Sequence, residues 1–137
     1  MSNRQVNTYV GRSYQLIRDA SARVEDVSRS LAERCTAPCA DPDGQLQLSV
    51  LTASSLLKQA ASVLQENQPA SATDQERVGS SEVMKRLLTA EEIIKEAWRD
   101  VARQRAGEPI RRDPAVTIAD AIGELLAAQN IQSQRSK

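Results

Sequence analysis

Apolar residues recur at alternating steps of four and three along the first quarter of the chain. The stripe consists of Val6, Val10, Ser13, Ile17, Ala20, Val24, Val27 and Leu31. A 3.5-residue period keeps one stripe of an α-helix facing a partner helix. The pattern predicts a long amphipathic helix over residues 3–34.

The same alternation appears twice more, in two later segments. A helix over 45–65 has the stripe Leu46, Val50, Ala53, Leu57, Ala60 and Leu64, and a helix over 81–106 has Val83, Leu87, Ala90, Ile94, Ala97 and Val101. Prolines and an Asp-Gly pair separate the first two helices, because proline cannot continue a helix and Asp-Gly favours a turn. Residues 67–79 are polar and lack periodicity, so we expect a mobile linker there.

A fourth and shorter helix is expected over residues 114–131, with an apolar face of Ile118, Ile122, Leu125 and Leu126. Two starting points compete: Asp113 as a cap before Pro114, or Thr117 with Asp120 three residues later. Residues 132–137 are expected to form a frayed tail.

These patterns predict an all-α fold in one domain that spans residues 1–137. The expected architecture is a bundle of three long antiparallel amphipathic helices with coiled-coil-like seams plus a short C-terminal helix. Large and small residues alternate along the stripes, with Ala53, Ala60, Ala90 and Ala97 at small positions. Small residues there let helix axes approach to about 8 Å.

The residue types needed for most catalytic sites are missing or unfavourably placed. The chain has no histidine and only five glycines, widely scattered. Di-metal Glu-x-x-His motifs, histidine-based triads and Gly-rich phosphate loops are therefore excluded. The clustered Glu91, Glu92 and Glu96 lie off the stripe and face basic residues three or four positions on, which favours surface ion pairs. We expect no enzyme activity and no bound cofactor.

Two cysteines, Cys35 and Cys39, lie in the segment between the first two helices. They could form a redox pair, or half of a metal site completed across a dimer. Zinc normally takes four Cys or His ligands, and the chain offers only two. We therefore expect free thiols and no metal site.

Overall charge and hydropathy argue against two classes of partner. Lys+Arg and Asp+Glu both number 18, so no net field attracts nucleic acid or anionic lipid. No stretch reaches the ~18 apolar residues that a membrane helix needs, and no apolar core follows the first residues as in a secretory signal. We expect a cytoplasmic protein without membrane contact.

Arginines gather around the end of the third helix, at Arg99, Arg103, Arg105, Arg111 and Arg112. They could contact phosphates in a nucleoprotein complex, or compensate the dipole at a helix C-terminus. The second interpretation is favoured because the chain is neutral and has few aromatic residues for base stacking. Nucleic acid is thus the less favoured partner.

The second helix suggests a protein partner. It has a single charged residue, Lys58, and its apolar Leu48 and Leu51 lie off the stripe. The first helix is also longer than the second, so Val6, Tyr9 and Val10 are expected to overhang it as a docking surface. We therefore expect an adaptor, or an oligomerising subunit of a larger complex, bound to another protein or to itself. The alternative is a monomer in which the fourth helix covers these flanks.

Overall fold

The computed structural model describes residues 2–33, 45–67 and 72–135, with side chains described for 9–31, 46–67 and 72–135. Its elements are four helices: α1 (Ser2–Glu33), α2 (Gln45–Glu66), α3 (Asp74–Arg105) and α4 (Pro114–Arg135). Within these ranges the chain has no strand, so the all-α prediction is confirmed. Cys35 and Cys39 lie outside the described residues.

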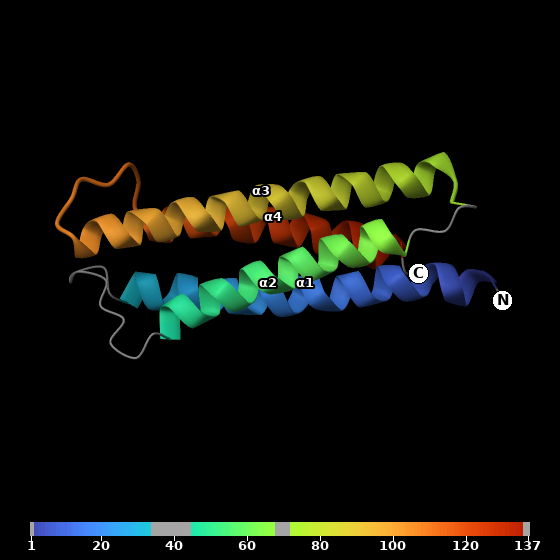
Figure 1. Ribbon diagram of the computed structural model, residues 1–137, viewed down its shortest axis with the longest axis horizontal. Helices are drawn as coiled ribbons and strands as arrows, with labels where there is room; N and C mark the ends of the chain where they lie inside the picture. The colour runs from blue at the N-terminus through green and yellow to red at the C-terminus, as the bar shows by residue number, and fades with distance from the viewer. Residues whose placement is uncertain (1, 34–44, 68–71, 136–137) are drawn as a thin grey trace.

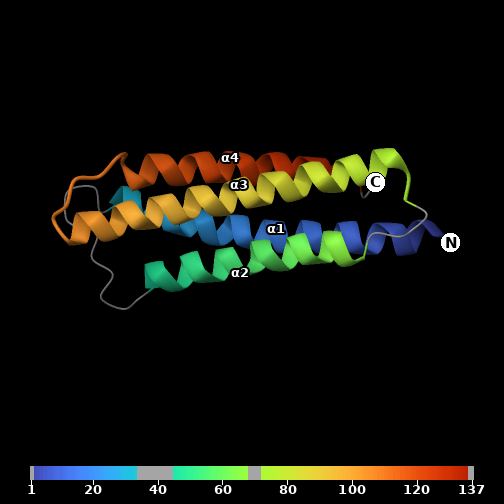
Figure 2. The ribbon, with the colours of Figure 1, turned by 45° about the horizontal axis from the view of Figure 1, so that its top comes forward.

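The four helices form an elongated bundle in which each helix runs opposite to the one before it (Figures 1 and 2). α1 packs against α2 and α4, and α3 packs against α4 and α2. In the described ranges the diagonal pairs, α1 with α3 and α2 with α4, make no contact of comparable extent. The interface between α2 and α3 is the smallest of the four, which leaves this side of the bundle most open.

The stripes read from the sequence form the core. Each described stripe residue of the first three helices is buried, and Ile118, Ala121, Leu125 and Ala128 complete the core from α4. The four alanines at small positions, Ala53, Ala60, Ala90 and Ala97, are all at most 1% exposed. Their burial agrees with the expected alternation of large and small layers.

α3 begins seven residues earlier than expected, so the predicted linker is wrong from residue 74 onward. Thr73 caps the helix, and its Oγ1 accepts a hydrogen bond from the backbone N–H of Glu76 at 3.2 Å. A threonine followed three residues later by glutamate is a capping-box sequence, and Asp74 adds an acidic residue to the first turn. At the other end, Gly107 adopts a positive φ of 73° just past the helix, as expected from a C-terminal glycine.

α4 starts where the Asp113–Pro114 pair predicts, and the alternative start at Thr117 is wrong. The Asp113 carboxylate accepts a hydrogen bond from the backbone N–H of Ala115 at 3.0 Å. The helix then continues to Arg135, so the expected frayed tail is helical up to that residue. α4 has 22 residues, as many as α2, and is therefore not the shortest helix.

The extra turn of α4 places a polar layer inside one end of the bundle, made of Tyr9, Ser13, Ser80, Gln132 and Arg135. Gln132 is fully buried, and its Nε2 donates to the Ser13 hydroxyl at 2.6 Å. The guanidinium of Arg135 donates to Gln132 Oε1 at 2.8 Å, to Ser80 Oγ at 2.9 Å and to the Tyr9 hydroxyl at 3.3 Å. Arg135 thereby ties α4 to both α1 and α3.

The longer α3 and α4 also correct the expected overhang of α1. Tyr9 and Val10 are only 4% and 2% exposed, because the N-terminal turns of α3 and the C-terminal turns of α4 extend alongside them. In the folded chain neither side chain is available to a partner. The side chain of Val6 lies outside the described residues.

Candidate interaction surface

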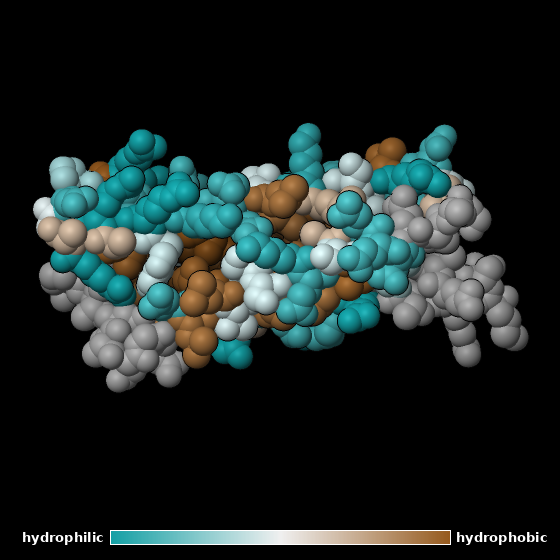
Figure 3. All heavy atoms as spheres, viewed as in Figure 1, coloured by the Kyte–Doolittle hydropathy of each residue, from teal (hydrophilic) through white to brown (hydrophobic). Residues whose placement is uncertain are grey.

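The outward face of α2 exposes apolar side chains in its first two turns. Leu48 and Leu51 are each 59% exposed, as the sequence led us to expect. Figure 3 shows apolar atoms protruding over the first half of α2. Ser55 and Ser62 continue this face toward the other end, and both are exposed. We call Leu48, Leu51, Ser55 and Ser62 the outer stripe.

The outer stripe follows from the spacing of residues along α2. The buried stripe occupies one side of the helix at steps of four and three. Steps of three, four and seven join the outer-stripe residues, so they too fall on one side, roughly opposite the core. α2 is therefore an amphipathic helix whose solvent side carries leucine and serine in place of charges.

The single charge of α2 is directed toward α3. Lys58 Nζ lies 3.6 Å from Glu91 Oε1, and Ser54 Oγ donates to the same carboxylate oxygen at 3.1 Å. Lys95 Nζ approaches it at 3.5 Å, and the Glu91 side chain is only 8% exposed. One buried carboxylate thus serves two ammonium groups across the smallest helix interface, and a surplus of positive charge remains beside the outer stripe.

On its other side the outer stripe borders α1. Arg12 lines a shallow pocket together with Leu51, Ser55, Ser62 and other α2 residues. Arg23 lies eleven residues further along α1, which is about three helical turns, so it lies on the same side of α1 near the start of α2. Both arginines are exposed, and neither has an acidic partner among the described residues.

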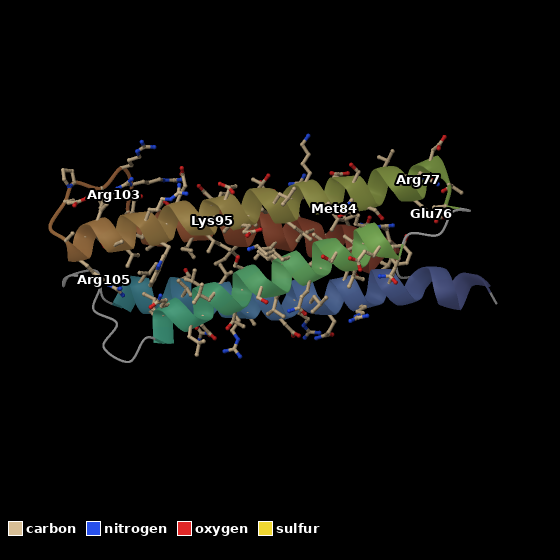
Figure 4. The ribbon with its side chains drawn as sticks, viewed as in Figure 1. Glu76, Arg77, Met84, Lys95, Arg103 and Arg105 are labelled. Carbon is tan, nitrogen blue, oxygen red and sulfur yellow. The ribbon has the colours of Figure 1, made fainter. Side chains whose placement is uncertain are left out.

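The C-terminal half of α3 borders the stripe from the opposite direction. Figure 4 shows Lys95 and Arg105 on the side of α3 nearer α2, with Arg103 on the other side. Trp98 is partly buried against the core, and the Arg105 guanidinium carbon lies 5.2 Å from the centre of its ring. This distance is that of a cation–π contact. Trp98 therefore supports the fold and holds an arginine in place.

The five arginines around the end of α3 do not form one free cationic patch. Arg103 Nη1 is 2.8 Å from Asp100, and Arg112 Nη1 is 2.5 Å from Asp120. Arg99 and Arg111 are exposed and have no acidic partner within the described ranges. Two ion pairs and one ring contact therefore engage three of the five side chains, which matches the helix-end interpretation better than a phosphate-binding surface.

A second shallow hollow lies along α3 next to α4, and its charges are largely matched. Arg86 pairs with Glu124 at 3.0 Å and with Glu82 at 3.7 Å, and these three residues line the hollow with Arg77 and Lys85. Leu88, on α3, is 59% exposed like the two α2 leucines. Leu88 therefore offers a control position of equal exposure away from the outer stripe.

The sequence identified the leucines of this surface and missed its borders. Leu48 and Leu51 are exposed as expected, whereas Tyr9 and Val10 are buried. Ser55, Ser62, Arg12 and Arg23 were not anticipated. A search for a second 3.5-residue period in α2 could have found the serines, but the arginines required knowledge of which face of α1 meets α2.

The described residues offer few other functional features. No group of three or more Cys, Asp or Glu side chains in the described ranges could hold a metal ion. None of the helices in these ranges combines the length and apolarity required to cross a bilayer. Comparison of the chain with protein-family models, with curated proteins and with solved structures finds no match.

Proposed function

We propose that this protein is a non-enzymatic interaction protein, an adaptor or oligomerising subunit of a larger complex, that binds a protein partner through the outer stripe of α2. The observation that carries the proposal is the pair of leucines at 59% exposure on a helix whose outward face has no charge along the stripe. Solvated helix faces normally carry charged residues, and exposed apolar clusters bordered by polar residues are typical of interaction sites.

Charging the outer stripe tests this function. We expect Leu48→Glu/Leu51→Glu to abolish partner binding or self-association and to leave helix content and thermal midpoint nearly unchanged, because both side chains are largely solvated already. Size-exclusion chromatography with light scattering, together with the stoichiometry of co-purifying protein, measures the effect. Leu88→Glu is the matched control and should behave as wild type.

A wild-type chain that is monomeric at high micromolar concentration and co-purifies with no stoichiometric partner contradicts the proposal. So does a Leu48→Glu/Leu51→Glu variant that retains its partner. Unfolding of that variant would place the two leucines in the core and would contradict the assignment of the outer stripe.

The alternative function, a helical subunit of a nucleoprotein complex, depends on Arg99 and Arg111, the two members of the arginine group without an acidic partner. We expect no salt-dependent binding of the wild-type chain to a mixed-sequence duplex, measured by fluorescence anisotropy, because the chain is neutral overall. Binding that weakens in Arg99→Ala/Arg111→Ala, with a flatter salt dependence, would favour the nucleoprotein function instead.

A further inference from the structure

The outer stripe has the shape that another helix requires. Leu48 and Leu51 are large residues at its first turns, and Ser55 and Ser62 are small residues further along. Small side chains let a neighbouring helix approach closely, and large ones fill the spaces between its side chains. All four are exposed in the folded chain, so nothing described needs to move before a helix docks.

Cations border this stripe on both sides. Arg12 and Arg23 lie on the α1 side, and Lys58 belongs to α2 itself. Lys95 and Arg99 lie on exposed positions of α3. The nearby acids are Glu66, at the far end of α2, and Glu91 and Glu92, which both lie within 4 Å of Lys95. These five cations and three acids give the surface a net charge of about +2, in a chain whose total charge is zero.

This charge distribution discriminates between occupants. A second copy docked about a two-fold axis would bring the same cations together from both chains, and like charges across an interface cost free energy. Two half-exposed leucines also supply far less than the ~800 Å² per partner that a standard stable interface buries. Affinity must therefore come in part from opposite charges on the partner.

We infer that the outer stripe binds an acidic amphipathic helix of another protein. This inference rests on the proposed function and names the chemistry of its partner. The apolar seam of the bound helix contacts Leu48 and Leu51 and crosses the serines closely. Glutamates or aspartates on the two flanks of its seam lie against Arg12 and Arg23 on one side, and against Lys95 and Arg99 on the other.

Three synthetic helical peptides provide the probe. Each has about 21 residues, or three heptads, with the same leucine seam. Their flanking positions are all Glu, all Lys or all Gln. Binding to the full chain is measured by fluorescence anisotropy. We expect the Glu peptide to bind at least about ten-fold more tightly than the Lys peptide, and its affinity to fall as salt rises from about 0.05 to about 0.5 M.

Two variants assign the binding to named residues. Leu48→Glu/Leu51→Glu should abolish binding of the Glu peptide, whereas Leu88→Glu should retain it, since the leucines exchanged have equal exposure. Arg12→Glu/Arg23→Glu/Arg99→Glu should reverse the preference, so that the Lys peptide binds more tightly. Circular dichroism confirms that each variant remains folded.

Equal affinity for the Glu and Lys peptides, or absence of binding by all three, overturns the inference. Binding of the Glu peptide that survives Leu48→Glu/Leu51→Glu does so as well, because it places the site elsewhere. A wild-type chain that dimerises through the outer stripe, and loses the dimer in that variant, replaces the acidic helix with a second copy. That last result supports the proposed function while removing the inference, so the two can fail separately.

Discussion

Replacing Ala60 with leucine should lower the free energy of unfolding by about 1–3 kcal/mol. Ala60 is completely buried at a small position of the α2 stripe, between large residues at Leu57 and Leu64. Three extra carbon atoms there must push α2 away from the core or force its neighbours into poor rotamers. Chemical denaturation, followed by helix signal, measures the loss.

An exposed alanine provides the control for this substitution. Ala119 lies on the solvent side of α4, so Ala119→Leu should change stability by no more than about 0.5 kcal/mol. An Ala60→Leu variant that unfolds at the wild-type denaturant midpoint would show that the small layer has room to spare. The close packing described for the α2 seam would then be wrong.

Replacing Ser13 with alanine should cost about 1–3 kcal/mol, although it removes only one oxygen atom. The Ser13 hydroxyl accepts the hydrogen bond from Gln132 Nε2 at 2.6 Å, and both side chains are fully buried. Without that hydroxyl the amide nitrogen keeps its desolvation penalty and loses its acceptor. The expected effect is a lower midpoint in urea with an unchanged m-value.

A second substitution should recover part of this loss. In the Ser13→Ala background, Gln132→Leu removes the stranded amide and fills the site with an apolar side chain, which is often nearly neutral when both partners are replaced. The double variant should therefore be more stable than Ser13→Ala alone. A double variant that is less stable than either single variant would mean that Gln132 contributes chiefly through its contact with Arg135.

The sequence predicted most of the fold because periodicity is a local property. Seam positions such as Ile17, Leu57 and Ile94 repeat at regular steps, and these residues are buried. The start of α3 was missed because Thr73–Glu76, a capping box, lies in a polar stretch without apolar residues to mark a face. The end of α4 was missed for a related reason, since Gln132 resembles a solvated residue until its partner on α1 is known.

The candidate interaction surface was predictable only in part. The near absence of charge on α2 is visible in the sequence, and it correctly indicated exposure of Leu48 and Leu51. The overhang of α1 depended on comparing helix lengths, and underestimating α3 and α4 made Tyr9 and Val10 seem free. The borders of the surface depend on which helices are neighbours, which a repeat shared by several helices leaves undetermined.

The polar layer also fixes how far α4 can slide. Because the apolar layers of α1 and α4 repeat every seven residues, shifting α4 by one heptad would still match large residues with small ones. The shift would place Gln132 beside Ala20, one heptad along α1 from Ser13, and would bring Leu125 opposite the Ser13 hydroxyl. Both polar groups would then be buried without each other, at a cost of about 1–3 kcal/mol for each group. One glutamine near the end of the chain thus singles out one alignment among several that the aliphatic residues alone would accept.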